Sequence, residues 1–249
     1  MEEQDSEALS FRTVCRKNGL PIVDSRLELL KEYVLHLLDW NRKINLISRK
    51  DVDNIWGRHI LGSVSFLFRR RLQPGSSFID IGTGGGLPGI PIAILWPDLH
   101  GTLIDSIQKK VKAVVDIVEK LSLENVEAVC GRAEALSLEA KYHRSFDYVI
   151  ARAVGSVEDL IRWGMPFLKT VQANDAAQKA GPNVPPRQES YGNTFARGSI
   201  LLLKGGELDK ELEDARNKTG PRRLQAFTIR IEGADASDSV DKKLVVIEP

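Results

Sequence analysis

The chain has little cysteine and no long hydrophobic run. Its 249 residues contain two cysteines, Cys15 and Cys130, which form no CxxC or Cys/His pattern. A disulfide framework or a metal site is therefore not expected, and isolated thiols fit a reducing cytoplasm. No stretch of about 18 apolar residues is present, so we expect no membrane-spanning helix. Residues 1–5 are acidic where a secretory signal would be basic and then apolar, so we expect no such signal.

A surplus of charge of either sign is also missing. The 35 Lys and Arg residues nearly balance the 34 Asp and Glu residues, and the formal net charge is +1. The overall charge therefore gives no argument for a nucleic-acid or membrane partner, and any basic binding surface must be local. The length is sufficient for one large domain, or for one domain with an extension.

What the chain does have is a glycine-rich turn that follows a short apolar run. Residues 78–81 read Phe-Ile-Asp-Ile, five of the eight residues 82–89 are glycine, and an apolar periodic segment follows Pro88. This order predicts a buried strand, a tight turn and the start of a helix. Glycines allow the backbone to approach a ligand closely, and a helix N-terminus presents unpaired N–H groups. The pattern predicts a nucleotide or nucleoside cofactor site.

Helical patterns precede this turn, and alternating strand and helix patterns follow it. The predicted helices cover residues 6–17, 25–40, 52–71, 109–121, 157–168 and 207–216, and a capping box begins the second at Ser25. Residues 133–138 are predicted to form a brief turn or helix. Besides the strand at 78–81, the predicted strands cover residues 102–105, 126–129, 146–151, 200–204, 227–232 and 244–247. Such alternation predicts an α/β fold with a mainly parallel, seven-stranded sheet and helices on both faces.

Two units and one insertion are expected along the chain. Residues 1–72 are predicted to form an N-terminal helical extension, and residues 73–249 a cofactor-binding domain. Residues 171–198 are polar, contain prolines and lack a sustained period. They are therefore predicted to form a mobile surface insertion.

Two classes of cofactor fit the glycine turn. Residues 84–89 satisfy G-x-G-x-x-G and Asp105 lies about 20 residues further on, as in an NAD(P)-binding oxidoreductase. Residues 80–86 also satisfy acidic-x-Gly-x-Gly-x-Gly, the pattern of a Rossmann-like class I methyltransferase that uses S-adenosylmethionine (SAM). There, Asp105 would accept hydrogen bonds from the ribose, and residues 131–135 would meet the adenine. We find no proton donor or small-substrate site for an oxidoreductase, so the methyltransferase is favoured. A non-enzymatic SAM-binding protein remains a third class.

Motifs along nearly the whole chain resemble one methyltransferase family. They are Trp40-Asn41 with Asn45-Leu46, Arg58-His59-Ile60-Leu61, Asp80 to Gly84 with Gly86-Leu87-Pro88-Gly89-Ile90-Pro91, Leu103 to Ser106, Arg132-Ala133-Glu134, Ile150 to Ala153, Leu203-Lys204-Gly205 and Leu244 to Ile247. In these motifs the chain is similar to the bacterial 16S rRNA guanine-N7 methyltransferase G family, also called glucose-inhibited division protein B. The resemblance and the glycine motif together imply these SAM-binding residues: Gly82, Gly84, Leu87, Asp105, Ala133, Glu134 and Arg152.

The resemblance also implies the substrate, a guanosine in the decoding-centre loop of 16S rRNA, either free or in the small ribosomal subunit. Guanine N7 carries a lone pair, so in-line methyl transfer needs positioning and no general base. Arg152 is assigned this positioning role, while Arg58, His59 and Lys204 are candidate RNA contacts. Gly62 is a departure, because the family usually has Asp there. We expect a cytoplasmic protein that is a monomer.

Overall fold

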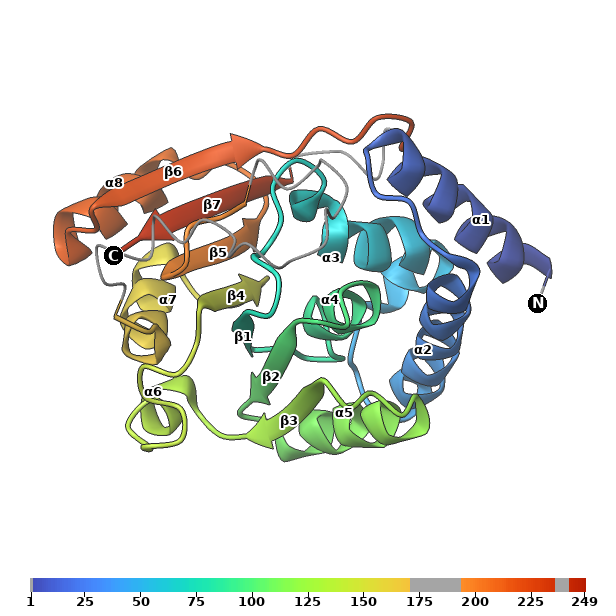
Figure 1. Cartoon of the computed structure of the whole chain (residues 1–249), viewed down its shortest axis with the longest axis horizontal. Coiled ribbons are helices and arrows are strands. Elements are labelled where there is room, and N and C mark those ends of the chain that lie inside the picture. Colours follow the sequence, from blue (N-terminus) through green and yellow to red (C-terminus); the bar gives the residue numbers. More distant parts are fainter. Residues whose placement is uncertain (1, 171–193, 236–241) are drawn as a thin grey trace, which may run out of the picture.

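A computed structural model describes residues 2–170, 194–235 and 242–249 of the chain. A seven-stranded sheet of order β3-β2-β1-β4-β5-β7-β6 crosses the molecule (Figure 1). Its strands are β1 (Ser77–Ile81), β2 (His100–Asp105), β3 (Val126–Cys130), β4 (Tyr148–Arg152), β5 (Ser199–Lys204), β6 (Arg223–Thr228) and β7 (Lys243–Glu248). The strands β1 to β5 pair in parallel, whereas β7 runs antiparallel between β5 and β6. The predicted mainly parallel sheet is confirmed.

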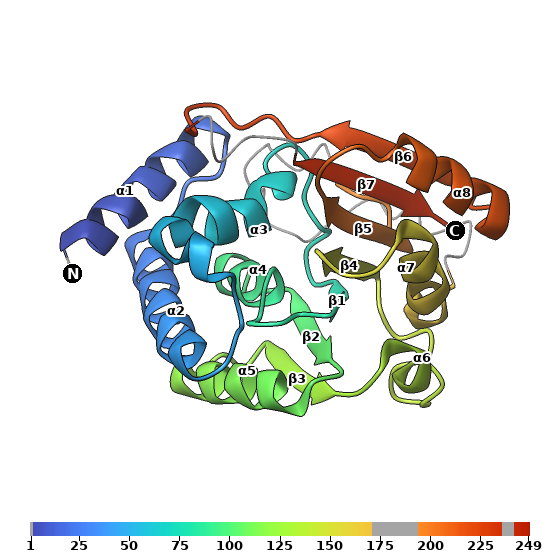
Figure 2. The same ribbon diagram turned by 180° about the vertical axis from the view of Figure 1, so that it is seen from behind.

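Helices cover both faces of this sheet, as the opposite views in Figures 1 and 2 show. One face carries α1 (Glu2–Lys17), α2 (Asp24–Lys43), α4 (Gly89–Leu95) and α5 (Gln108–Lys120); the other carries α6 (Ala133–Leu136), α7 (Val157–Gly164), the 3₁₀ turn η4 (Met165–Phe167) and α8 (Asp209–Thr219). Alternate strand residues enter the two cores: Phe78 and Ile150 face the first group, and Ile79 and Val149 face the second. The runs of consecutive apolar residues follow from burial on both faces.

The N-terminal helices share a hydrophobic core with the sheet, in which Leu30 and Leu37 of α2 lie in one cluster with Phe78. A division of the chain at residue 72 remains a prediction. The predicted capping box at Ser25 is wrong, because α2 begins at Asp24 with Val23 at the N-cap and no side-chain capping bond. A capping box is present instead at the start of α7, where Ser156 and Asp159 bond each other's backbone N–H groups.

The single helix predicted over residues 52–71 is wrong. The segment consists of the 3₁₀ helix η1 (Arg49–Asn54), the π-helix η2 (Trp56–Leu61), the short α3 (Gly62–Val64) and the 3₁₀ turn η3 (Ser65–Leu67). The apolar periodicity is real, since Ile60 and Val64 are fully buried. Backbone oxygens in η2 accept bonds from side chains elsewhere in the chain, and such contacts favour local changes of helical pitch.

Two further boundaries differ from the prediction. The strand predicted at 227–232 lies at Arg223–Thr228, because this edge strand buries only Leu224 and lacks an alternating apolar pattern. Residues 171–193 of the predicted insertion lie outside the described residues. One of its last residues is packed: Phe195 is 2% exposed, and its N–H donates to the Arg71 carbonyl at 2.9 Å. The surface prediction is wrong for Phe195.

Replacing Phe195 with alanine should therefore destabilise the protein strongly. We expect Phe195→Ala to lower the free energy of unfolding by about 3–5 kcal/mol, since it removes a buried aromatic side chain. Phe227→Ala is the matched control, because Phe227 is 42% exposed, and we expect a change within about 0.5 kcal/mol. Urea unfolding measures both, and equal effects of the two variants would contradict the packing of Phe195.

Candidate active site

The glycine turn after β1 is held against the end of β2. The N–H groups of Gly82 and Thr83 both donate to the carbonyl of Ile104, at 2.9 and 3.0 Å. Gly82 and Gly84 have φ values of +73° and +59°, which side-chain-bearing residues rarely adopt. The helix α4 then begins at Gly89, with Pro88 at its N-cap. The predicted strand, turn and helix start are confirmed.

Asp80 joins the two ends of this turn. Its Oδ2 accepts hydrogen bonds from Thr83 Oγ1 at 2.7 Å and from the Gly89 N–H at 3.0 Å, and the residue is fully buried. Its Oδ1 is buried without a hydrogen-bond partner among the described residues. Burial raises the pKa of Asp80 to about 7, although the bonds from Thr83 and Gly89 act in the opposite direction. Asp80 therefore fixes the turn from inside.

Asp105 stands beside the turn at the end of β2. Its Oδ2 accepts the Gly84 N–H at 3.1 Å, and its Oδ1 accepts the Ile107 N–H at 2.9 Å. Its backbone carbonyl accepts the Gly131 N–H at 3.1 Å, which brings the loop after β3 to the same place. This loop leads into α6, where Ala133 is buried and Glu134 is exposed.

The candidate cofactor residues thus gather at one edge of the sheet. The turn contributes Gly82, Gly84 and the nearly buried Leu87, β2 contributes Asp105, and the loop after β3 contributes Ala133 and Glu134. The set offers carboxylate oxygens, close backbone approach and an apolar side chain. These groups fit a nucleoside: the carboxylate matches ribose hydroxyls, and the glycines leave room for the chain attached to the ribose.

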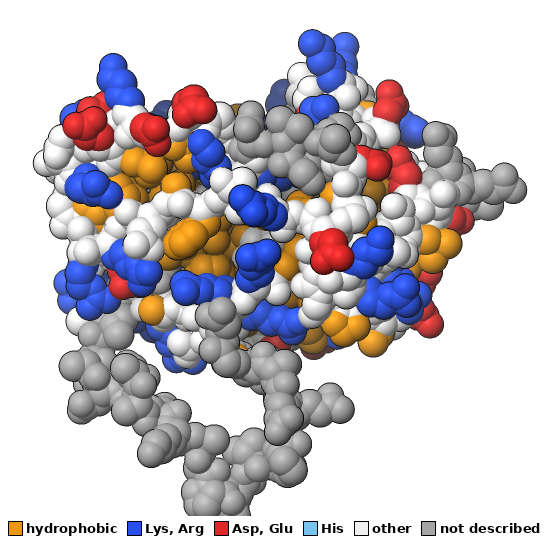
Figure 3. Space-filling view, turned by 90° about the horizontal axis from the view of Figure 1, so that it is seen from above, with side chains coloured by type: hydrophobic (Ala, Val, Ile, Leu, Met, Phe, Trp, Pro, Cys, Tyr) orange, Lys and Arg blue, Asp and Glu red, His pale blue; other side chains and the backbone are white. Residues whose placement is uncertain are grey.

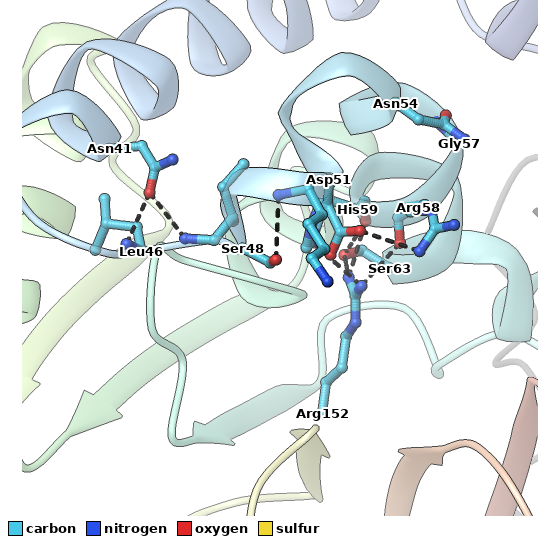
Figure 4. Close-up of polar contacts among 12 residues, drawn as sticks. Asn41, Leu46, Ser48, Asp51, Asn54, Gly57, Arg58, His59, Ser63 and Arg152 are labelled. Atoms are coloured by element: carbon cyan, nitrogen blue, oxygen red, sulfur yellow. Dashed lines mark hydrogen bonds and ion pairs between the residues drawn. The ribbon is translucent and has the colours of Figure 1, made fainter.

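Arg152, at the end of β4, points from the same edge into the N-terminal segment (Figure 4). Its guanidinium donates to the carbonyls of Arg58 at 2.8 Å and His59 at 3.0 Å, and to Ser63 Oγ at 2.9 Å. It also lies 3.3 Å from His59 Nδ1. Burial lowers the pKa of Arg152. Arg152 therefore binds the sheet edge to the π-helix η2.

A second cation, Lys242, reaches the same π-helix. Its Nζ donates to the Gly57 carbonyl at 3.3 Å. A Cβ atom on Gly62 would lie 3.3 Å from this Nζ and 3.6 Å from an Arg152 nitrogen. Gly62, where the family usually has Asp, thus faces two cations. Lys242 comes close because β7 runs antiparallel to β5, so its start lies beside the end of β5.

The candidate RNA residues Arg58 and His59 share one carboxylate. Asp51 Oδ1 pairs with Arg58 at 3.0 Å, and its Oδ2 lies 3.5 Å from His59 Nε2 without hydrogen-bond geometry. Burial, with the nearby Arg152 charge, lowers the pKa of His59 to about 4 despite Asp51. His59 is therefore neutral at neutral pH, whereas the Arg58 side chain is a cation with half its surface exposed.

Lys204 lies on the other side of the sheet edge. Its Nζ donates to the Gly155 carbonyl at 2.8 Å and to Glu211 Oε1 at 2.7 Å. Glu211 also accepts the N–H of Val157, the first residue of α7. The structure thus engages the Lys204 amino group within the chain and does not bring it to Arg58 and His59. Its contact with RNA remains a prediction.

A hollow of about 350 Å³ opens at this edge of the sheet. Its lining includes Gly62, Arg152, Ala153, Lys204 and Lys242. It lies where β4 and β5 end, which is where α/β sheets bind ligands. The hollow is large enough for a small aromatic ring. Its lining contains four cationic residues and two glutamates, Glu207 and Glu211.

Several residues of this site carry no signal in the sequence. Tyr33 is fully buried in α2 and donates to the Gly85 carbonyl at 3.0 Å, supporting the turn. Asp51 and Ser63 meet Arg58, His59 or Arg152 only through the fold. A single carboxylate or hydroxyl of this kind looks like an ordinary surface position in a sequence, and no motif distinguished either residue.

The described residues contain no group of three or more His, Cys, Asp and Glu side chains that could hold a metal ion. No helix among them is long and apolar enough to cross a bilayer.

Solved structures place the fold in a known class. A predicted O-methyltransferase from Agrobacterium tumefaciens matches with a TM-score of 0.50 and 16% identity, over 76% of this chain and 79% of that chain. A chain of a fibrillarin/Nop5p complex matches with a TM-score of 0.51 and 8% identity, over 76% and 79%. The fold is the class I, Rossmann-like fold of SAM-dependent methyltransferases, as predicted.

Curated relatives identify the family. The ribosomal RNA small subunit methyltransferase G of Flavobacterium johnsoniae is 36% identical over 193 residues, 78% of this chain and 80% of the relative. The protein of the same name from Bacteroides fragilis is 38% identical over 201 residues, 81% and 84%. The family model described as GidB, rRNA small subunit methyltransferase G, matches residues 26–174. The chain belongs to this family, which confirms the resemblance and does not favour an oxidoreductase or a non-enzymatic SAM-binding protein.

The buried Asp80 should make stability depend on pH. Its pKa is about 7 in the folded chain and about 3.9 in an unfolded one. The folded chain therefore binds more protons between these values, and this stabilisation is present below about pH 4 and is lost as the pH rises through about 7. Asp80→Asn keeps an acceptor oxygen for Thr83 and Gly89 and removes the titration. We expect the fall in unfolding free energy over this range to be smaller in the variant. Urea unfolding at several pH values measures this free energy. If it falls equally steeply with pH in the variant and in the unaltered protein, the pKa assigned to Asp80 is contradicted.

Proposed function

We propose that this protein transfers a methyl group from SAM to N7 of a guanosine of 16S rRNA. The observation that carries this proposal is the gathering of the glycine turn, Asp105 and Arg152 at one sheet edge, in a chain of the rRNA small subunit methyltransferase G family. The named relatives are small-subunit rRNA methyltransferases. That substrate implies a cytoplasmic enzyme, and the free state of Cys15 and Cys130 fits a reducing compartment.

SAM is the methyl donor, and when bound it supplies an electrophilic methyl group on its sulfonium. Asp105 would hold the ribose hydroxyls, because its carboxylate ends β2 next to Gly84. Gly82, Gly84 and Leu87 would line the side of the methionine chain, while Ala133 and Glu134 would border the adenine. All these residues come from one chain, and we propose that a monomer suffices.

The residues of the hollow position the guanine. Guanine N7 carries an in-plane lone pair and no proton, so the protein needs no base at this atom. Its task is to hold N7 in line with the methyl group, and such positioning can lower a barrier by several kcal/mol. Arg152 lines the hollow, and the carbonyls of Arg58 and His59 hold its guanidinium in one orientation. The target guanine and the cofactor would both lie next to this oriented side chain. We assign it a positioning role.

The candidate RNA contacts divide by charge and exposure. Arg58 is the best phosphate contact, since half of its side chain is exposed while Asp51 holds it. His59 is neutral at neutral pH, because burial lowers its pKa, so it would act through hydrogen bonding. Lys204 lines the hollow with its amino group bonded to Gly155 and Glu211, so it would contact RNA from that fixed position.

Removing the Asp105 charge should weaken SAM binding. We expect Asp105→Asn to raise the SAM dissociation constant by about tenfold or more, since hydrogen bonds to charged groups contribute about 1.5–3 kcal/mol. Asp98→Asn is the control: Asp98 also accepts a glycine N–H, from Gly75 at 3.3 Å, but precedes the start of β2 at the opposite end of the strand. Isothermal titration calorimetry measures both, and an equal effect of the two would contradict the ribose assignment.

The product of the reaction tests the proposal directly. The protein, incubated with methyl-labelled SAM and either small ribosomal subunits or naked 16S rRNA, should place the label on the RNA. Nuclease digestion and mass spectrometry should then give 7-methylguanosine from a single position. Label found only on protein or on a small molecule would reject the rRNA substrate, and label on another nucleoside would reject guanine N7.

A further inference from the structure

A second hollow, which we call the arginine groove, lies between η3 and the adjoining ends of β6 and β7. Its volume is about 340 Å³, and Phe66, Phe227, Arg69, Arg70, Arg230 and Leu244 are among its lining residues. None of these residues belongs to the cofactor set. Volumes above about 300 Å³ are typical of sites for small organic groups. The groove can therefore accept one such group.

The groove combines an apolar floor with unpaired cations. Phe66 and Leu244 are 4% and 6% exposed, whereas Phe227 offers its ring to solvent at 42%. Among the described residues, no carboxylate forms an ion pair with Arg69, Arg70 or Arg230, and none lines the groove. The face shown in Figure 3 has the same character: hydrophobic side chains lie in hollows bordered by Lys and Arg.

One buried hydroxyl also lacks a partner there. Ser65 lines the groove and is only 3% exposed, and its Oγ has no hydrogen-bond partner among the described residues. A buried polar atom without a partner costs free energy unless a ligand or water meets it. The groove therefore offers an exposed ring, three cations and one hydrogen-bonding hydroxyl. This combination fits a nucleotide: the base stacks on the ring, and the phosphate lies against guanidinium groups.

The arginine groove adjoins the hollow at Arg152. Ile229 lines both, and the consecutive residues Lys243 and Leu244 line the hollow and the groove respectively. A single strand whose target base enters the hollow can therefore continue directly into the groove. A duplex cannot, because its bases are stacked inside the helix.

We propose that the arginine groove binds an unpaired nucleotide of the RNA strand next to the methylated guanosine. The base stacks on Phe227, and Arg69, Arg70 and Arg230 meet its phosphates. This inference rests on the proposed function, because the strand is the one that brings the guanosine to the hollow. The groove acts in docking and has no part in SAM binding.

Binding of a short RNA tests the groove without the reaction. A 5′-fluorescein-labelled uridine octanucleotide, measured by fluorescence anisotropy at low salt, should bind about tenfold more weakly to Phe227→Ala, as expected for loss of one stacked base. Arg230→Gln should also bind more weakly and should reduce the slope of log affinity against log salt by about 0.7. The matched controls are Leu138→Ala, at an exposed apolar residue, and Arg144→Gln, at an exposed arginine near α6. Equal effects in variants and controls would overturn the proposal.

Methylation of 16S rRNA separates this inference from the proposed function. Phe227→Ala and Arg230→Gln should raise KM for RNA about tenfold, with kcat at saturating RNA and the SAM dissociation constant unchanged. If the unaltered protein methylates no rRNA, the proposed function fails, whereas the octanucleotide still tests the groove. If it methylates rRNA and the two variants match their controls, only the groove assignment fails. Loss of activity on intact subunits alone, with naked rRNA methylated normally, would assign the groove to a protein partner and overturn the RNA proposal.

Discussion

The half-buried Arg152 guanidinium constrains how the sheet and the N-terminal segment fit together. A cation partly removed from water must meet acceptors, because an unpaired buried charge is very costly. Arg152 finds them in the carbonyls of Arg58 and His59 and in the Ser63 hydroxyl. These carbonyls belong to a π-helix, in which the regular α-helical bonding pattern is interrupted. Burial, together with the Arg152 charge, also lowers the pKa of His59. The shape of the site and the protonation state of its histidine are therefore set together.

The parts that could be predicted from sequence are those whose causes are local. The parallel strands are short apolar runs because both faces are buried, and the turn is recognisable because only glycine readily adopts the positive φ values of Gly82 and Gly84. The interruption of the predicted third helix has a distant cause, since Arg58 and Arg152 are 94 positions apart. The edge strand β6 was misplaced because it buries only Leu224. For Lys204 the strand end was predictable, but its partner Glu211 was not.

The net charge of +1 does not reveal that one surface of the protein, the arginine groove, carries positive charges alone. The arginine groove is lined by three arginines and no carboxylate among the described residues, although 34 acidic residues balance the chain overall. A protein of this kind attracts nucleic acid only weakly at long range, because potentials at distance follow the summed charge. Under the proposed function, selection of RNA then depends on short-range fit: an exposed ring, bordering guanidinium groups and a hollow of limited size.

The antiparallel insertion of β7 has a consequence for synthesis of the chain. In the described sheet β6 pairs only with β7, which the ribosome makes later, and β7 lies between β5 and β6. Growing chains begin to fold from the N-terminal side while translation continues. Here β1 to β5 can assemble in that way, but β6 stays unpaired until β7 has been synthesised. Lys242, which directly precedes β7, reaches the π-helix η2 only at that stage as well. The proposed RNA-facing edge is therefore complete only after β7 has been synthesised, so a growing chain that still lacks β7 cannot engage RNA through that edge.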